Sequence, residues 1–170
     1  RARAKFKTLK YKTPKLDDHQ LFNTVRLKEL FAAERAIVDK YNATVEAAAK
    51  EAADAATAAV SAGMDAPPLP TPPPPPTEPL LSPADEAEKQ RLVVSGFANW
   101  TRREFNAFVR GCERYGRNDT KAIAAEVGPT KTVADVHLYA AEFWRRGPTT
   151  LESWPRLCKS IEDGETKLER

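Results

Sequence analysis

Few side chains in this sequence could carry out acid–base, nucleophilic or metal chemistry. Its 170 residues include two histidines, His19 and His137, and two cysteines, Cys112 and Cys158. Structural zinc sites use closely spaced ligand pairs, and these four residues form none. The phosphate-binding loop G-x-x-x-x-G-K-[ST], the G-x-S-x-G elbow and the H-E-x-x-H zinc motif are also missing. We therefore expect no catalytic site, no metal and no cofactor in this chain.

Basic side chains offer a different chemistry, the binding of phosphates. Residues 1–15 contain seven lysines and arginines and no acid, so residues 16–170 sum to −4 when the whole chain carries +3. A basic arm on a near-neutral body favours a polyanion, nucleic acid first and an anionic membrane second. A solvated, disordered terminus is the alternative reading of the arm. The DNA-binding candidates are Arg1, Arg3, Lys5, Lys7, Lys10, Lys12 and Lys15 in the arm, and Arg102, Arg103, Arg114, Arg117, Lys131, Arg145 and Arg146 beyond it.

The second group of cations lies in a stretch, residues 96–147, that has the pattern of three capped helices. Its predicted helix ends are Thr101 with Glu104, Gly116, Asn118 or Asp119, Gly128-Pro129, Thr132 with Asp135, and Gly147-Pro148. Large apolar residues recur at helical spacing between these ends, and a unit of about 50 residues needs them as its core. The predicted core residues are Trp100, Phe105, Phe108, Tyr115, Ile123, Val136, Tyr139 and Phe143. We also expect both cysteines to be buried and reduced.

The rest of the chain predicts an all-α fold with one long interruption, since no useful alternating apolar run indicates a strand. An amphipathic helix is expected from Leu21 to about Tyr41, after caps at Asp17-Asp18. The alanine-rich residues 43–62 continue it as an exposed helix or fray. Residues 67–83 hold 10 of the 14 prolines, which indicates a stiff polyproline II spacer or, alternatively, a PxxP ligand. Ser82 caps a further helix, and residues 151–169 form the last one.

Residues 96–144 resemble the SANT domain of imitation-switch (ISWI) family chromatin-remodelling ATPases. The matching letters are GFANWTRREFNAFVRGCERYGRND, then IAAEV, then YAAEFW. Before them, LLSPADEAEKQRLVVSGF resembles the acidic helix that leads into SANT, and DHQLFNTVRLKELFAAE resembles the start of the HAND domain. After them, LESWPRLCKSIEDGETKLER resembles the spacer helix towards the SLIDE domain. The alanine- and proline-rich residues 47–77 replace a charged helical part of HAND.

Composition and the resemblance together predict a division of the chain into six segments. These are a basic arm (1–15), a HAND-like helical region with an alanine-rich tail (16–62), a proline-rich linker (63–83), a connecting helix (84–95), a SANT domain (96–147) and the start of the spacer helix (150–170). SLIDE and the motor do not occur in the sequence, so ATP and Mg are expected to act in the parent protein. The implied partners are the nucleosome, linker double-stranded DNA, histone tails and remodeller subunits, in the nucleus. No apolar run approaches the roughly 20 residues of a membrane span.

Two interpretations of the SANT-like stretch remain open. Its third helix lacks Asn, Gln, Lys and Arg from residue 133 to 143, so base reading of the Myb type is disfavoured, and the second tryptophan of Myb is missing near Thr120. The first interpretation is sequence-independent DNA binding by the arm and the arginines. In the second, a basic histone tail or another protein binds an outward stripe of the third helix, for which Asp135, Leu138 and Glu142 are the candidate residues.

Overall fold

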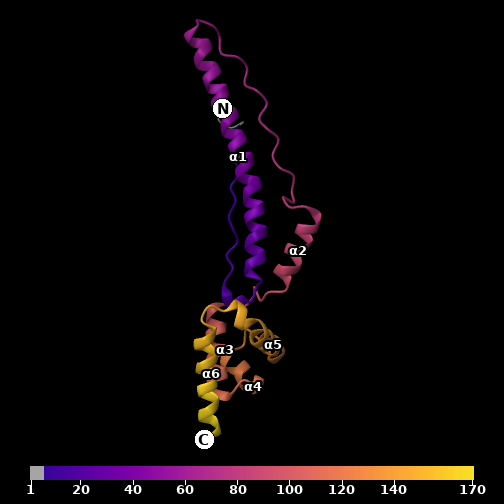
Figure 1. Cartoon of the computed structure of the whole chain (residues 1–170), viewed down its shortest axis with the longest axis vertical. Coiled ribbons are helices and arrows are strands. Elements are labelled where there is room, and N and C mark those ends of the chain that lie inside the picture. Colours follow the sequence, from indigo (N-terminus) through magenta and orange to yellow (C-terminus); the bar gives the residue numbers. More distant parts are fainter. Residues whose placement is uncertain (1–5) are drawn as a thin grey trace. The chain divides into compact units, whose positions relative to one another are not determined.

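The structure, a computed structural model, describes residues 6–170. These residues are helical or irregular, without a strand, which confirms the predicted all-α class (Figure 1). A 3₁₀ turn, Asp18–Gln20, is followed by α1 (Thr24–Ser61), α2 (Pro83–Val94), α3 (Arg102–Tyr115), α4 (Thr120–Val127), α5 (Val133–Thr150) and α6 (Trp154–Glu169). Within this described range, no helix is both long and apolar enough to cross a membrane.

The chain divides into two compact units, which are described separately. The long-helix unit comprises residues up to Pro14 together with Lys28–Glu88. The aromatic-core unit comprises Lys15–Leu27 together with Lys89–Arg170. The predicted HAND-like region, residues 16–62, is thus shared between the two units.

Stacked and edge-on rings form the centre of the aromatic-core unit. The rings of Trp100 and Tyr139 stack with their centroids 4.0 Å apart, and Phe108 packs edge-on against both. Seven of the eight predicted core residues are buried, Trp100, Phe105, Phe108, Ile123, Val136, Tyr139 and Phe143. Tyr115 is the exception, because it is the last residue of α3 and its side chain is 41% exposed.

Two segments complete this core from outside the three predicted helices. His19 is 2% exposed and its Nε2 lies 2.8 Å from the carbonyl oxygen of Trp100, while the Tyr139 hydroxyl donates to the His19 carbonyl. On the other side, α6 packs along α3, with Ile161 fully buried. Gly164 in α6 lies so close to the Glu113 backbone that a Cβ would collide with it. The core therefore includes α6 and the preceding turn in addition to the three predicted helices.

Most helix ends follow the predicted signals. Thr101 with Glu104 and Thr132 with Asp135 both form complete capping boxes, and the Asp119 side chain caps α4. The stop predicted at Gly147-Pro148 is wrong, because α5 continues to Thr150 with Pro148 inside it. Gly147 lies against the Trp154 ring, where a Cβ would clash, so packing against α6 holds this last turn.

The long-helix unit is built differently. Its helix runs without a break through the alanine-rich residues to Ser61, which settles the choice between an exposed helix and fraying. The helix begins at Thr24, three residues later than predicted, because Leu21 and Phe22 pack in the aromatic-core unit. The proline-rich segment has no helix or strand and runs back beside α1 (Figure 1). A hollow between the two is lined by Ala52, Ala55, Ala56 and residues 66–70.

Candidate nucleic-acid interface

The basic arm is held on α1 by two side chains of that helix. The Asn42 side chain accepts a hydrogen bond from the Leu9 amide at 2.8 Å and donates one to the Leu9 carbonyl at 2.9 Å. Two residues further, the Tyr11 hydroxyl donates to the Glu34 carboxylate at 2.9 Å. Partial burial, together with this bond to Glu34, raises the pKa of Tyr11 to about 12. The hydroxyl therefore remains a donor at neutral pH, and the arm is pinned at two points.

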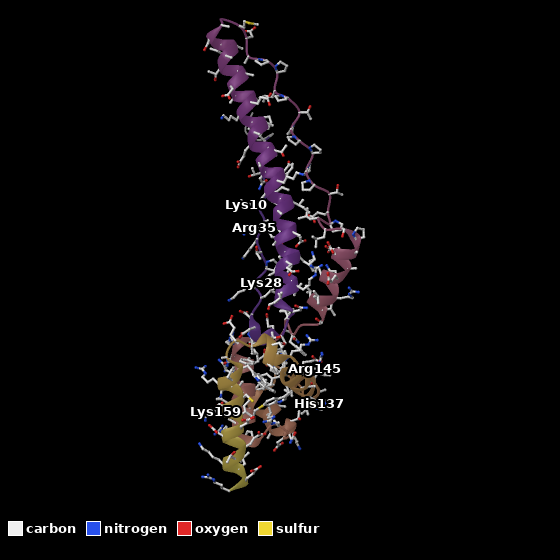
Figure 2. The ribbon with its side chains drawn as sticks, viewed as in Figure 1. Lys10, Lys28, Arg35, His137, Arg145 and Lys159 are labelled. Atoms are coloured by element: carbon white, nitrogen blue, oxygen red, sulfur yellow. The ribbon has the colours of Figure 1, made fainter. Side chains whose placement is uncertain are left out.

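The lysines near these anchors are exposed to solvent. Lys7, Lys10 and Lys12 are exposed, and none of them has an ion-pair partner among the described residues. Figure 2 shows Lys10 on the arm and Lys28 and Arg35 on α1, so this unit carries further cations. The side chain of Lys15 is 86% exposed and lies 3.6 Å from Asp17. The candidates Arg1, Arg3 and Lys5 lie outside the described residues.

A second basic surface lies on the outer face of α3. The exposed positions of this helix include Arg103, Asn106, Arg110 and Arg114, at spacings that place them in one row. Arg110 and Arg114 both pair with Glu126 of α4, at 3.5 and 3.3 Å, while their side chains stay 57% and 63% exposed. Arg103 is exposed, and no residue in the described part of the chain pairs with it.

Arg102 lies beside this row and is partly engaged. Its guanidinium donates to Asp18 at 3.1 Å and lies 5.5 Å from the centroid of the Phe105 ring. The side chain nevertheless remains 54% exposed, so the cation can still face a ligand. Together with this residue, α3 offers four arginines to solvent, each of them on a rigid helix.

Lys131 is a DNA-binding candidate that the structure places inside the fold. Its ammonium lies 2.8 Å from Glu104 and 3.0 Å from the Asn99 carbonyl, and its side chain is 7% exposed. Burial alone would raise the pKa of Glu104, but hydrogen bonds from Lys131, Thr130 and Thr101 outweigh it and lower this pKa to about 2. Lys131 therefore neutralises a buried carboxylate and fixes the α3 capping box. It is too deeply buried to contact DNA.

Arg117 is a second candidate with a structural role. It forms a two-pronged ion pair with Glu165 of α6, with N–O distances down to 2.8 Å. Its guanidinium also lies 3.9 Å from the centroid of the Trp144 ring. The hydrogen bonds from Arg117 hold the pKa of the Glu165 carboxyl below its usual range. Arg117 connects α6 to the end of α3, which leaves it little freedom to bind phosphate.

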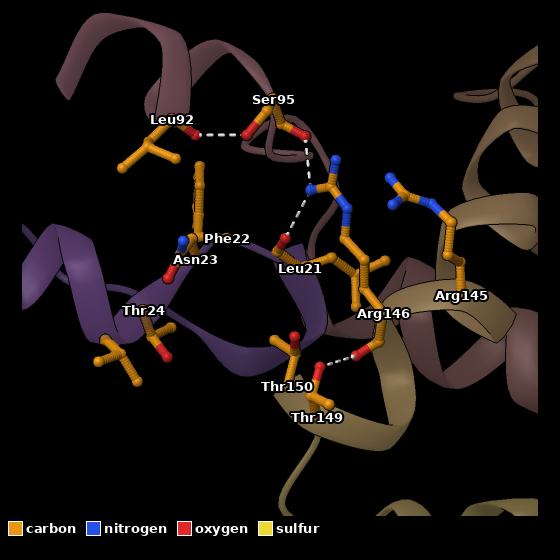
Figure 3. Close-up of a pocket in the computed structure, with 11 residues that line it drawn as sticks. Leu21, Phe22, Asn23, Thr24, Leu92, Ser95, Arg145, Arg146, Thr149 and Thr150 are labelled. Atoms are coloured by element: carbon orange, nitrogen blue, oxygen red, sulfur yellow. Dashed lines mark hydrogen bonds between the residues drawn. The ribbon is translucent and has the colours of Figure 1, made fainter. Parts of the chain in front are cut away.

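Arg146 is also engaged, at the wall of a hollow of about 420 Å³ between residues 21–25, Leu92, Ser95 and α5 (Figure 3). Its guanidinium donates to the carbonyls of Leu21 and Ser95, both at 3.0 Å, and pairs with Glu142 at 2.6 Å. Arg145 pairs with the same carboxylate but stays 65% exposed at the rim. Of the two arginines, only Arg145 is exposed enough to meet a ligand.

On the outer face of α5, the structure places both carboxylates of the predicted acidic stripe in contacts within the chain. The Asp135 carboxylate accepts the Thr132 amide in the capping box, and Glu142 is held by two arginines. The exposed residues that remain on this face are Val133, Ala134, His137, Leu138, Ala141 and Arg145. Leu138 is 62% exposed, as expected of an outward position. The face is mainly apolar, with one exposed arginine at its end.

The cysteines differ in exposure. Cys112 is fully buried, and this burial raises its pKa to about 12, so the thiol stays protonated. Cys158 is only partly buried, which corrects the expectation for it, because it lies on the side of α6 where it meets Glu162. Among the described residues, no three His, Cys, Asp or Glu side chains are grouped as metal ligands would be.

The described residues thus form an all-helical chain with an aromatic core and exposed basic side chains, and this sequence was compared with known proteins. No protein-family model matches the chain. Over 155 residues, or 91% of the chain, it is 39% identical to a probable chromatin-remodeling complex ATPase chain of Oryza sativa. Over 90 residues, or 53% of the chain, it is 44% identical to an Arabidopsis thaliana ISWI chromatin-remodeling complex ATPase. The same share is 40% identical to a human SWI/SNF-related regulator of chromatin, subfamily A member 1.

These similarities show that the chain is a homologue of one region of ISWI-type chromatin-remodelling ATPases, as the resemblance of residues 96–144 predicted. The chain spans only 8–12% of the length of these relatives.

Proposed function

We propose that this chain is a nucleosome- and linker-DNA-binding module of an ATP-dependent chromatin remodeller, acting in the nucleus. The observation that carries the proposal is the anchored arm, in which Asn42 holds the Leu9 backbone and Glu34 holds the Tyr11 side chain. The lysines between and beside these anchors, Lys7, Lys10 and Lys12, are exposed to solvent. A pre-ordered row of lysines suits a polyanion, because less conformational entropy is lost when it binds. The exposed arginines of α3 supply a second set of phosphate contacts.

Binding without sequence preference fits the outer face of α5. Direct reading of bases needs side chains such as Asn, Gln, Arg or Lys at groove-facing positions. The exposed face instead carries alanines, His137 and Leu138, with Arg145 at the end. Phosphate contacts from the arm and from α3 would fix position without reading sequence.

A salt titration tests the proposal. Binding to a nucleosome with linker DNA should fall steeply with salt and exceed binding to a core particle without linker. Neutralising Lys7, Lys10 and Lys12 to Gln should reduce the log–log slope by about 0.9 for each phosphate that the arm no longer neutralises. The matched control neutralises Lys121, Arg156 and Lys167, three exposed cations of the aromatic-core unit. Equal slopes for the two triple variants would reject the arm as the DNA-binding segment.

A second candidate function is favoured by the apolar side chains on α5. Leu138 and Val133 are 62% and 49% exposed on the same face, which suits a protein or a histone tail better than a phosphate backbone. Leu138→Asp should then abolish binding of a histone peptide and leave DNA binding intact. The double charge reversal Asp135→Lys with Glu142→Lys tests whether the peptide binds the acidic residues of α5 instead of its apolar residues. Peptide binding that survives all three changes would exclude this face.

The proposal also includes an ATPase motor and further subunits, which we assign to the parent protein. The relatives are named as ATPases, and the chain matches only a small share of each of them. We therefore place ATP and Mg in a motor elsewhere in the parent protein, with other remodeller subunits as further partners. The module itself would position that motor on chromatin.

A further inference from the structure

Three Ser/Thr-Pro dipeptides occur in the chain, and they have different surroundings. Proline-directed protein kinases modify such sites. Ser82, before Pro83, is the N-cap of α2 and accepts the Asp85 amide at 3.2 Å. Thr71, before Pro72, lies in the proline-rich segment, where no lysine or arginine is within ten residues on either side. Thr13, before Pro14, lies in the basic arm.

Thr13 lies in an exposed, irregular stretch that is accessible to a kinase. Lys12, Thr13, Pro14 and Lys15 are four consecutive exposed residues with no helix or strand. In the described part of the chain, no hydrogen bond involves Lys12, Thr13 or Pro14. The anchors at Leu9 and Tyr11 lie before this stretch, so it can enter a kinase cleft without the helix unfolding.

Charge makes the same position sensitive to modification. Lys10, Lys12 and Lys15 lie within three residues of Thr13, and Asp17 is the first acid after it. A phosphate brings about −1.5 to −2 charges at neutral pH and accepts hydrogen bonds from lysines. It would therefore cancel about two of the charges that the proposed function assigns to DNA binding.

We propose that Thr13 is a phosphorylation site for a proline-directed kinase, and that its modification releases the arm from DNA. The inference rests on the proposed function of the arm. In the transfer, Thr13 Oγ1 attacks the γ-phosphorus of ATP and the bond to the β-phosphate oxygen breaks. ADP leaves, and the hydroxyl proton passes to the base of the kinase. The lysines then pair with the phosphothreonine of their own arm in place of DNA phosphates.

The first experiment locates the modification. The full chain is incubated with a cyclin-dependent kinase and Mg·ATP, and the products are mapped by peptide mass spectrometry. Phosphate is expected on Thr13, absent in Thr13→Ala and kept in the control Thr8→Ala, which changes an exposed arm threonine not followed by proline. Phosphate confined to Thr71 or Ser82 would overturn the proposal.

The second experiment measures binding to linker DNA before and after modification. The phosphorylated chain is expected to bind on the order of tenfold more weakly at about 0.15 M salt, with a salt slope lower by about one to two. Phosphatase treatment should restore binding, and kinase-treated Thr13→Ala should bind like the untreated chain. Equal affinity of the two forms would overturn this inference and leave the proposed function standing. An unmodified chain that does not bind DNA would instead reject the proposed function itself.

Discussion

Lysine and arginine side chains have different roles in the two units. In the aromatic-core unit, Lys131, Arg117 and Arg146 are each fixed by a carboxylate and by backbone or ring contacts. In the long-helix unit, the arm is fixed through Asn42 and Tyr11. Its described lysines in this unit, Lys7, Lys10 and Lys12, have no ion-pair partner among the described residues. The number of cations in a segment therefore does not identify an interface. A segment is a better candidate for an interface when its backbone is held by the fold and its charged groups have no partner within the chain.

The units also differ in how they bury apolar surface. One packs stacked aromatic rings that are almost fully excluded from solvent. The other has a helix whose second half is mostly alanine, covered on one side by prolines and with Val60 67% exposed. Burial of large rings contributes much more free energy per residue than burial of alanine methyls. Stability should therefore be concentrated in the aromatic-core unit.

The largest effect is expected from removing the central ring. Trp100→Ala should destabilise the aromatic-core unit by about 3–5 kcal/mol, since it leaves a large cavity against Tyr139 and Phe108. Val60→Ala in the long-helix unit should change stability by no more than about 0.5 kcal/mol. Urea unfolding followed by tryptophan fluorescence measures the first, because Trp144 and Trp154 also lie in this unit. Similar losses of stability in the two variants would contradict the conclusion that stability is concentrated in the aromatic-core unit.

A second test compares the removal of a buried cation, Lys131, with the removal of an exposed one, Arg103. Lys131→Met should destabilise the unit by about 3 kcal/mol, because Glu104 is left as a buried, unpaired carboxylate. Arg103→Met should leave stability unchanged and weaken DNA binding, since Arg103 is exposed and lacks a partner among the described residues. Urea unfolding and a DNA titration on both variants check this. A fully stable Lys131→Met that binds DNA poorly would place Lys131 in the interface.

The pH dependence of stability tests the same ion pair between Glu104 and Lys131. The pKa of Glu104 is about 2 in the folded chain against an ordinary 4.5. Because the folded pKa is the lower one, its stabilisation is complete above about pH 5 and disappears as the pH falls towards 2. The difference in pKa, about 2.5, corresponds to about 3 kcal/mol. Glu104→Gln should be less stable than the native chain at pH 7, and this difference should vanish by pH 2, measured by urea unfolding at each pH.

Local sequence signals predicted the parts of the fold that depend on neighbouring residues. The capping boxes of α3 and α5 and the aromatic stripe of α3 need only three- and four-residue spacings, and the structure has them. The stop at Gly147-Pro148 failed because a contact with Trp154 of the next helix supports the turn. His19 was missed as a core residue for a similar reason, since its partner Trp100 is 81 residues away.

For the candidate site, the sequence identifies the charged residues but not the contacts that each of them makes. Sequence alone identifies cations, but Lys131 and Arg146 are excluded as DNA ligands only when Glu104 and Glu142 are seen beside them. The capping motif predicted that the Glu104 carboxylate is held at the start of α3, but it did not predict that Lys131 pairs with it. Nothing in the spacing of the arm indicated Asn42, which is 33 residues from Leu9.

The smallest effect, and the most direct test of the arm, is expected from Asn42→Ala. The change removes both hydrogen bonds to Leu9 without removing a cation. DNA affinity should fall by a few-fold, because the arm must then be ordered at the moment of binding, whereas the salt slope should not change. Hydrogen exchange of the Leu9 amide should become faster. Thr44→Ala, an exposed change two residues further along α1, is the control.

The two readouts of this variant separate geometry from charge. A slope that falls together with affinity would mean that Asn42 affects the number of phosphates bound. Unchanged affinity with faster exchange at Leu9 would mean that order in the arm does not matter for binding. Only a loss of affinity at constant slope supports an arm whose lysines are effective because the helix already holds their backbone.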